Sequence, residues 1–555
     1  MRFASFTYLA PPLVSVALLF GCLPAQAPPK PRAHLAVATD HEAATQAAVT
    51  VMSQGGNALD GAIAAALVLG VVSPAASGIG GGGFALVWSE RDKKLVALDF
   101  REIAPLGISA EASVARKTKG VAVGIPGEPA GLFWLSTHGA KLSLAVDAAP
   151  AIALARNGFA VGQHLSDAIT KLHGLWEGTL LAPELSPFGT TPAGQQWHRV
   201  ALAHTLDRFA VEGKEPFYSG DIGEKIRVAA VGDGSSMTIA DLAGYQVRER
   251  TALSRTFGKR TVSTMPAPSA GGLMLLEHLV MWGADGRSSL HAFGFGTSAY
   301  DHAIAETMRG AIADRARFAG DPAFEVDVGK SYDRLLDDTH LAARRRAMLP
   351  DRTRPGVEFK SVEDGTSHLV VVDSDGNVVS LTTTVNSPFG ARILVGDTGI
   401  WLNDELNDFS VPDDVAGYGT SGLGPNPPRG GARPVSSMTP TIVFENGEPI
   451  LAVGGSGGRR IATAVTQATL CRLVFDADPT ACVSAPRIYT NGTTLFVDPE
   501  VPESTRADLT AAGETIVTET MLGSGVQMIA IDRSSSTMTF RAAADPRKLG
   551  VAFAR

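Results

Sequence analysis

A serine set among four glycines, Gly454-Gly-Ser456-Gly-Gly458, is the first candidate nucleophile in this sequence of 555 residues. The run matches the G-x-S-x-G turn on which many hydrolases carry a catalytic serine between a strand and a helix. Such a serine needs a histidine further along the chain as its base, but all 12 histidines lie at or before His368. We therefore expect no serine triad here. We expect a glycine turn at a helix N-terminus, whose N–H groups suit a developing oxyanion.

A second glycine run, Gly78-Ile-Gly80-Gly-Gly-Gly83, matches the G-x-G-x-x-G fingerprint of dinucleotide-binding sites. That fingerprint requires a strand before the glycines and a helix after them. Here a helical pattern precedes the run and a strand pattern follows it. This order predicts close backbone packing rather than a nucleotide site, so we expect no nucleotide cofactor. We also expect no metal, because the cysteines lack a metal-ligand pattern.

The other candidate hydroxyl belongs to Thr366, which stands in the run Gly365-Thr-Ser-His. Strand-like residues 368–373 and 378–386 flank a Ser-Asp-Gly-Asn turn, which predicts a hairpin. Thr384 lies 18 residues after Thr366, on the second strand of this hairpin. Taken alone, Thr366 is an ordinary residue at the start of a strand, so the rest of the chain must decide its role.

Several segments, in order along the chain, resemble the γ-glutamyltranspeptidases, members of the N-terminal-nucleophile hydrolase superfamily. The resemblance covers nearly everything from about residue 34 to the end. The segments that carry it are Gly55–Asp60, Ser77–Phe84, Asp99–Pro105, Met265–Gly272, Ala313–Arg315, Thr366–His368, Asn403–Ser410, Arg433–Pro440 and Gly457-Gly458. The chain departs from the family pattern at Ala75-Ala76, Gly365, Ser367 and Asn407.

The resemblance implies a precursor that cuts itself between Gly365 and Thr366. The Thr366 hydroxyl attacks the Gly365 carbonyl, and an N-to-O shift and hydrolysis split the chain. The freed α-amine has a reference pKa of about 7.7–8.0, so it can act as general base without a histidine. By the same resemblance, the Thr384 hydroxyl hydrogen-bonds Thr366 and orients it. The backbone N–H groups of Gly457 and Gly458 stabilise the oxyanion, each contributing about 3 kcal/mol.

A γ-glutamyl group carries an α-carboxylate and an α-ammonium, and the family pattern supplies partners for both. The residues implied are Arg101, Ser436 and Ser437 for the carboxylate, and Asn386, Glu405 and Asp408 for the ammonium. The planar fork of an arginine suits bidentate pairing with a carboxylate. One cation and two anions complement an amino-acid zwitterion. We therefore expect a γ-glutamyltransferase and glutathione hydrolase that passes the acyl group from Thr366 to water, an amino acid or a peptide.

Two other functions remain open for this sequence. A glutaryl-type acylase, such as a cephalosporin acylase, could use the same scaffold, but its substrate has no ammonium for Glu405 and Asp408. An uncleaved surface lipoprotein could bind glutathione or peptides without chemistry. The net charge of −8 provides no basic footprint for nucleic acid.

The elements that must position these residues follow partly from the resemblance and partly from local patterns. The resemblance implies an α+β fold, a four-layer αββα sandwich whose two antiparallel sheets are shared by a large subunit (34–365) and a small subunit (366–555). Local patterns predict a helix capped by Asp40 and ending near Met52, and a buried helix at 58–69 capped by Asn57. Residues 128–350 look mostly helical, and residues 411–434 resemble the family's lid with Tyr418 as its gate.

The N-terminus predicts export. Arg2 precedes the apolar stretch Leu9–Phe20, and Leu19-Phe-Gly-Cys22 resembles a bacterial lipobox. We expect a lipoprotein signal at 1–21, a Pro-rich tether at 22–33 and a lipid anchor on Cys22, in the periplasm or at the outer membrane of a bacterium. Ala25-Gln-Ala27 is a rival cleavage site, although the proline that follows disfavours it.

Cys471 and Cys482 leave two possibilities open. An exported protein can pair them as a disulfide, or they can be two small buried residues.

Overall fold

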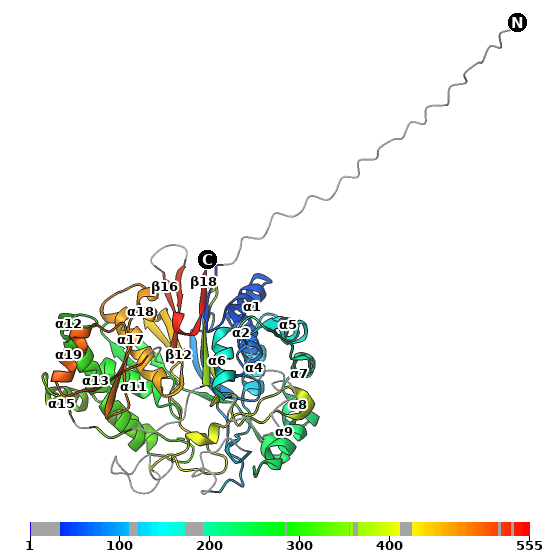
Figure 1. Ribbon diagram of the computed structural model, residues 1–555, viewed down its shortest axis with the longest axis horizontal. Coiled ribbons are helices and arrows are strands. Elements are labelled where there is room, and N and C mark those ends of the chain that lie inside the picture. The colour runs from blue at the N-terminus through cyan, green and yellow to red at the C-terminus, as the bar shows by residue number, and fades with distance from the viewer. Residues whose placement is uncertain are drawn as a thin grey trace. The chain divides into compact units, whose positions relative to one another are not determined.

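Two antiparallel sheets lie face to face at the centre of the molecule, with helices on both outer sides (Figure 1). The computed structural model describes Met1 and residues 34–109, 120–172, 192–282, 286–354, 356–358, 365–410, 424–519, 523–533 and 538–555. Residues 33–555 form one compact unit. Apart from Met1, the predicted signal lies outside the described residues, as do the tether with Cys22, Tyr418 and most of the predicted lid.

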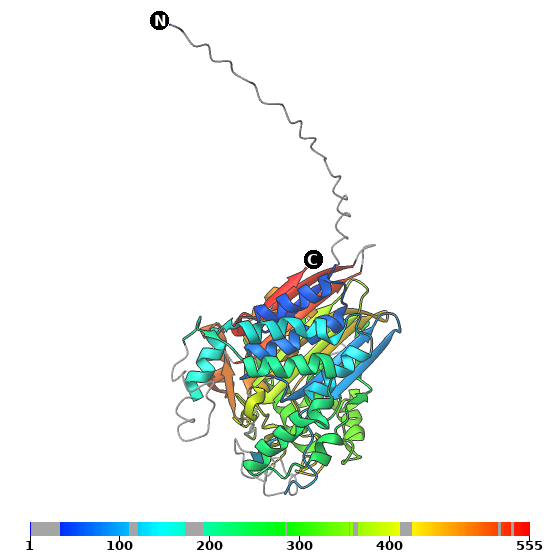
Figure 2. The same ribbon diagram turned by 90° about the vertical axis from the view of Figure 1, so that its right-hand side faces the viewer.

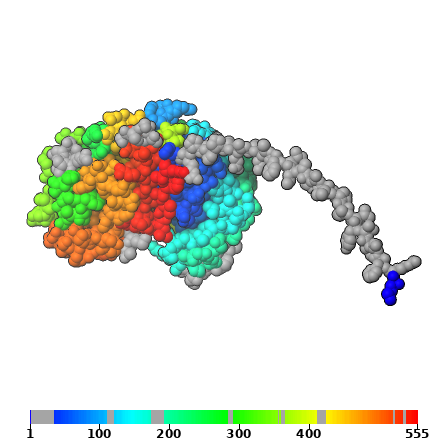
Figure 3. All heavy atoms as spheres, turned by 90° about the horizontal axis from the view of Figure 1, so that it is seen from above, coloured from blue at the N-terminus to red at the C-terminus, as the bar shows by residue number. Residues whose placement is uncertain are grey.

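The first sheet has seven strands. Their order across the sheet is β18 (Val551–Ala554), β1 (Ala36–Thr39), β9 (Gly365–Val372), β10 (Val378–Asn386), β2 (Gly82–Ser89), β3 (Lys94–Phe100) and β6 (Arg248–Arg250). The C-terminal strand therefore pairs with the first strand of the chain, and the red and blue surfaces adjoin in Figure 3. The sheet combines strands from both sides of the bond between Gly365 and Thr366.

The second sheet has six strands and is shared in the same way. Their order is β17 (Thr539–Ala544), β16 (Gly525–Asp532), β12 (Glu448–Ser456), β11 (Thr441–Glu445), β8 (Arg260–Thr264) and β7 (Leu253–Phe257). Two small sheets lie apart from these, β13 (Ile488–Thr490) with β14 (Thr494–Val497) and β15 (Thr515–Thr518), and β4 (Phe159–Ala160) with β5 (Gln196–Trp197).

Helices cover the outer face of each sheet, and in Figure 2 the blue and cyan helices lie across the first sheet. The helices on that side are α1 (Glu42–Ser53), α2 (Ala58–Val72), α4 (Glu128–Thr137), α5 (Leu144–Asn157), α6 (Gln163–Leu172), α7 (Val200–Glu212), α8 (Glu215–Tyr218), α9 (Asp221–Gly232) and α10 (Ile239–Ala243). Those on the side of the second sheet are α11 (Gly271–Met281), α12 (Gly286–Phe293), α13 (Ser298–Phe318), α14 (Val328–Leu335), α15 (Asp338–Ala347), α17 (Ile461–Val474), α18 (Pro479–Ser484) and α19 (Glu503–Ala511). This arrangement confirms the predicted αββα sandwich.

Strand β9 contributes to both hydrophobic cores. Leu369 and Val371 point to the core beneath α1, α2 and α5, whereas Val370 and Val372 point into the core between the two sheets. The alternation follows from the two-residue period of a strand, and both faces are buried. Because β9 is enclosed on both faces, the residue at its beginning has a fixed position.

Three local predictions have clear outcomes. Asn57 caps α2 in a capping box with Asp60, and every residue of α2 is buried, as expected. The helix α1 begins later than predicted, and its cap is the side chain of His41 rather than Asp40. Strands β6, β7 and β8 interrupt the stretch expected to be mostly helical. The prediction missed them because their short runs carry many charged and polar residues and lack a strong apolar pattern.

Cys471 and Cys482 form a disulfide with a Cα–Cα separation of 5.5 Å, which links α17 to α18. Across the described ranges, no helix has the length and hydropathy that a membrane span requires.

Candidate active site

Thr366 is the second residue of β9, and Thr384 on β10 lies directly opposite it in the register. Both side chains are nearly buried, with 4% and 3% of their surfaces exposed. The hairpin predicted from the Ser-Asp-Gly-Asn turn is therefore confirmed, and it brings the two hydroxyl residues together.

The Thr384 hydroxyl contacts the peptide unit at the predicted cleavage site. Its Oγ1 donates a hydrogen bond of 2.5 Å to the carbonyl oxygen of Gly365 and accepts one of 2.8 Å from the N–H of Asn386. We expected this hydroxyl to bond Thr366; in the uncut chain it bonds the neighbouring carbonyl instead. A donor on that oxygen stabilises the negative charge that develops when a nucleophile attacks its carbon.

Gly365 occupies a narrow space. A Cβ atom added there would stand 2.7 Å from the carbonyl oxygen of Asn386 and 2.8 Å from that of Ala75. Both neighbours are backbone atoms, which cannot rotate away as a flexible side chain can. A residue with a side chain therefore cannot fit here without a shift of the strands.

Gly457 and Gly458 form the turn between β12 and α17, as the sequence predicts. Their φ angles are +116° and +59°, a backbone conformation that strongly favours glycine. Strand β12 packs across β9, with Gly454 directly against the ring of His368. Burial lowers the pKa of His368 to about 3, so this ring is neutral and serves as a core residue.

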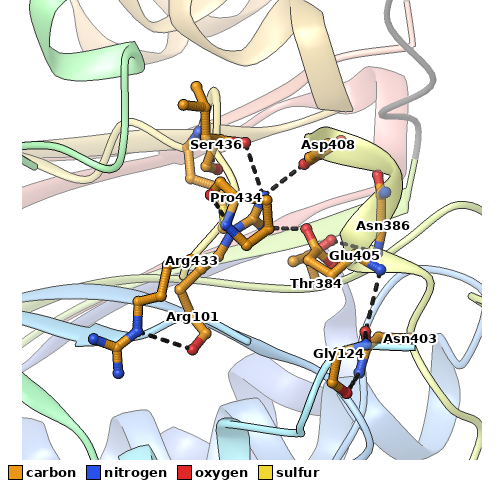
Figure 4. A network of polar contacts seen from close by, with 12 residues as sticks. Arg101, Gly124, Thr384, Asn386, Asn403, Glu405, Asp408, Arg433, Pro434 and Ser436 are labelled. Carbon is orange, nitrogen blue, oxygen red and sulfur yellow. Dashed lines mark hydrogen bonds and ion pairs between the residues drawn. The ribbon is translucent and has the colours of Figure 1, made fainter. Parts of the chain in front are cut away.

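Arg101 lies at the centre of a buried charge cluster (Figure 4). Its guanidinium forms ion pairs with Glu405 and Asp408, the latter at 2.6 Å. It also donates hydrogen bonds to the carbonyl oxygens of Pro434 (3.2 Å) and Val435 (3.0 Å). The predicted cation and the two predicted anions are thus in direct contact, and each side chain is 3% exposed or less.

The cluster carries more negative than positive groups. Burial raises the pKa of Glu405, and Arg101 opposes that shift. Burial also raises the pKa of the adjacent Glu102 to about 8, so Glu102 holds a proton at neutral pH. The site therefore limits its own excess of negative charge before any ligand enters.

Ser436 and Ser437 directly follow Pro434 and Val435, whose carbonyl oxygens accept from the Arg101 guanidinium. The Ser436 hydroxyl accepts a hydrogen bond from the N–H of Met438, and its backbone pairs with the turn at 268–270. Asn386 donates its side-chain N–H to the carbonyl oxygen of Asp404, beside Glu405. Its own Oδ1 is buried without a hydrogen-bond partner, which leaves an acceptor within the site.

Two residues with no assigned role in the sequence analysis support the cluster. The side chain of Asn403 bonds the carbonyl oxygens of Gly80 and Gly124 and accepts from the N–H of Glu405, so it holds Glu405 against the glycine run. Arg433 is fully buried, pairs with Asp99 at 3.4 Å and donates to the carbonyl oxygen of Arg101. Asn403 and Arg433 both lie within segments that carry the family resemblance, and this was the signal in the sequence that could have identified them.

No group of three or more His, Cys, Asp or Glu side chains among the described residues is arranged to hold a metal ion. The reactive groups in this region are hydroxyls, backbone amides and the charge cluster.

Comparison with known proteins gives one consistent answer. The chain matches the Gamma-glutamyltranspeptidase family over residues 44–554. It is 32% identical to the glutathione hydrolase proenzyme of Bacillus subtilis over 97% of each chain. It is 34% identical to glutathione hydrolase 2 of Arabidopsis thaliana over 93% of each chain. Its fold is similar to that of a cephalosporin acylase from Bacillus halodurans, with a TM-score of 0.82, 25% identity and coverage of 98% and 99%.

The matched region includes the hairpin of Thr366 and Thr384, the glycine turn and the Arg101 cluster. On this sequence similarity, which extends over nearly the whole chain, the protein belongs to the γ-glutamyltranspeptidase family.

Proposed function

We propose that this protein is a self-processing γ-glutamyltransferase and glutathione hydrolase that carries the γ-glutamyl group as an ester on Thr366. The observation that carries the proposal is the hydrogen bond from Thr384 to the Gly365 carbonyl, directly beside Thr366. It holds the bond to be cut next to the hydroxyl that cuts it. The proenzyme name of the relative from Bacillus subtilis agrees with such self-processing.

The reaction has two stages. First the Thr366 hydroxyl attacks Gly365, and hydrolysis of the resulting ester leaves residues 34–365 and 366–555 as two subunits joined by shared sheets. The free α-amine of Thr366 then takes the proton of its own hydroxyl, which attacks the γ-carbonyl of the donor. Gly457 and Gly458 donate to the oxyanion, and an acceptor amine or water releases the acyl group.

The Arg101 cluster supplies the donor specificity in this proposal. The substrate's α-carboxylate takes the guanidinium together with Ser436 and Ser437, and its α-ammonium takes Glu405, Asp408 and the unpartnered oxygen of Asn386. When the zwitterion binds, its two charges pair with Arg101 and the carboxylates, which otherwise neutralise one another. This exchange requires less desolvation than burying new isolated charges.

Self-cleavage is tested on a denaturing gel. The unaltered chain is expected to yield a fragment of 190 residues, the length of 366–555. T366A should remain one band and show no turnover of a γ-glutamyl anilide. The matched variant T366S keeps a hydroxyl and should still cleave, more slowly. A single intact band from the unaltered chain, with no hydrolysis, would favour a binding protein instead.

The acylase remains a second candidate because its fold covers nearly the same length. Comparing kcat/KM for γ-glutamyl and glutaryl anilides separates the two functions. We expect γ-glutamyl turnover to be faster by about 100-fold, since only this donor has an ammonium for the acidic pair. Faster glutaryl turnover would assign the acylase function.

We also propose that the protein acts outside the cytoplasm, anchored through Cys22. The disulfide between Cys471 and Cys482 supports an oxidising compartment. Mass spectrometry of the mature large subunit distinguishes a lipidated Cys22 from cleavage after Ala27.

A further inference from the structure

The strand that carries Thr366 extends past its neighbour. Strand β1 ends at Thr39, which pairs with Leu369, so residues 365–368 of β9 have no strand beside them on that side. Two side chains take the place of the missing strand. Nζ of Lys548 donates to the carbonyl oxygen of Thr366 at 3.0 Å, and Oδ2 of Asp40 accepts from the N–H of His368 at 2.9 Å.

Both side chains are held from behind. Asp40 is 7% exposed and accepts a second hydrogen bond, of 2.6 Å, from the side chain of Gln527 on β16. Gly525, which pairs with Ser456 at the end of β12, lies against both: a Cβ there would stand 3.1 Å from Asp40 and from Lys548. The pair thus joins the start of β9 to β16, and β16 pairs with β12, the strand that precedes the Gly457 turn.

The reacting nitrogen faces the same pair. The N–H and C=O of one residue in a β-strand point to the same side, and the Thr366 carbonyl points to Lys548. The nitrogen freed by cleavage at Gly365 therefore lies on the Asp40 and Lys548 side of β9. A cavity of about 210 Å³ opens there, and Thr366, Asp40 and Lys548 all line it.

We propose that Asp40 and Lys548 form a clamp that positions Thr366 and sets the charge state of its freed α-amine, so that the amine is the neutral base at working pH. Both are positioning residues, since they act on the substrate only through Thr366. The inference rests on the proposed function, in which that amine is the base.

The charged surroundings make Lys548 the decisive cation. The other titratable groups that line the cavity are His41 and Glu42 at the start of α1 and His164 in α6. Burial lowers the pKa of His164 to about 4 and also lowers that of His41, so both are neutral near pH 7. Behind the pair, Asp545 faces Asp40 and is ion-paired to Arg487.

The two members of the clamp act in opposite directions on the amine. A cation nearby disfavours the ammonium form and lowers the pKa of the amine, whereas a carboxylate raises it. Removing the charge of Lys548 leaves Asp40 unopposed, so the pKa of the amine rises. Removing the charge of Asp40 leaves Lys548 unopposed, so that pKa falls. A purely structural role predicts no such pair of opposite shifts.

The test compares the full-length protein with K548M, K548R and D40N. The pH dependence of kcat/KM for a γ-glutamyl anilide gives the pKa of the base from its acid limb. We expect K548M to shift this limb up by about one pH unit, D40N to shift it down by a similar amount, and K548R to match the unaltered enzyme. K330M removes an exposed lysine on α14 and should leave the profile unchanged.

A second readout does not need turnover. Labelling of the Thr366 amine by an amine-reactive reagent, followed with pH by mass spectrometry of the small subunit, measures the same pKa directly. If folded K548M cuts itself slowly and K548R restores the rate, the positioning part of the clamp is supported. Equal cleavage and equal profiles in all variants, or a K548R profile like that of K548M, would overturn the proposal. Failure of the unaltered chain to cut itself would instead contradict the proposed function.

Discussion

The strand that carries Thr366 has two differently built flanks. On the β10 side, the Arg101 cluster gathers a guanidinium and several carboxyl groups from short motifs with recognisable patterns. On the β1 side, Asp40 and Lys548 come from opposite ends of the chain, 508 residues apart, and contact the backbone of β9. In the function we propose, the first flank binds the donor, and the second holds the group that attacks it.

Under the proposed function, this division lets donor selection and nucleophile activation vary independently. Buried ion pairs such as those of Arg101 contribute little to stability, because desolvation offsets most of the attraction. Their value here lies in charge partners that a zwitterion can exchange. The Asp40 and Lys548 pair bonds the backbone of β9 and the side chain of Gln527, none of which belongs to a substrate, so it has no need to exchange partners.

The largest expected effect comes from altering the substrate flank alone. D408N removes one carboxylate from Arg101 and from the bound ammonium while keeping the side-chain shape. We expect kcat/KM for a γ-glutamyl anilide to fall about 100-fold, equivalent to about 2.7 kcal/mol, since truncating one member of a buried charge pair costs 2–5 kcal/mol. Hydrolysis of a glutaryl anilide, which has no ammonium, should fall much less.

Self-cleavage separates this effect from general damage. D408N should release the 190-residue fragment at the unaltered rate, because Asp408 bonds Arg101 and not the hairpin. D375N, on the exposed turn of that hairpin, serves as the matched control and should change neither rate. An equal loss of kcat/KM on both anilides would mean that Asp408 does not bind the ammonium of the donor. The two flanks would then no longer be distinct in function.

A smaller effect, on self-cleavage alone, is expected at the peptide bond between Gly365 and Thr366. G365A forces a Cβ against the carbonyl oxygens of Asn386 and Ala75, and such overpacking costs about 1–3 kcal/mol. The shift moves the Gly365 carbonyl away from Thr384, so we expect self-cleavage to slow about tenfold on a gel time course. G329A, at a glycine with open space around it, should cut normally.

Once cut, the same variant should behave as the unaltered enzyme. Residue 365 is then the free end of the large subunit and no longer constrains Thr366. We expect kcat/KM of the mature G365A enzyme to change less than twofold. A mature enzyme as impaired as its own precursor would show that residue 365 still shapes the site after cleavage.

The fold and the substrate flank were largely predictable because their signals are local. The glycine turn at Gly457, the hairpin at 365–386 and the Asn57 cap each follow from a few adjacent residues, and the family pattern supplied the αββα layers. Strands β6 to β8 were not predicted, since half-buried arginines and an exposed glutamate replace the alternation that marks a strand.

The clamp could not be predicted, and Asp40 shows why. An aspartate just before a helical run is a good candidate for a cap, but His41 fills that role and frees Asp40 to contact β9. A cap is decided by two or three neighbours, whereas this contact exists only after β1, β9, β16 and the C-terminal residues have assembled. No local pattern encodes such a meeting of chain ends.

The smallest effect on the reaction is expected at the disulfide, which belongs to neither flank. Cys471 lies ten residues beyond the start of α17, about 15 Å along the helix from the glycine turn. Replacing both cysteines by alanine should lower the free energy of unfolding by about 2–3 kcal/mol in urea titrations, because the open chain gains freedom only in the unfolded state. Self-cleavage and kcat/KM should stay within twofold of the unaltered enzyme. A larger kinetic change would mean that a structural change near Cys471 is transmitted along α17 to the Gly457 turn. The reactivity of Thr366 would then depend on the second sheet as well as on the two flanks of β9.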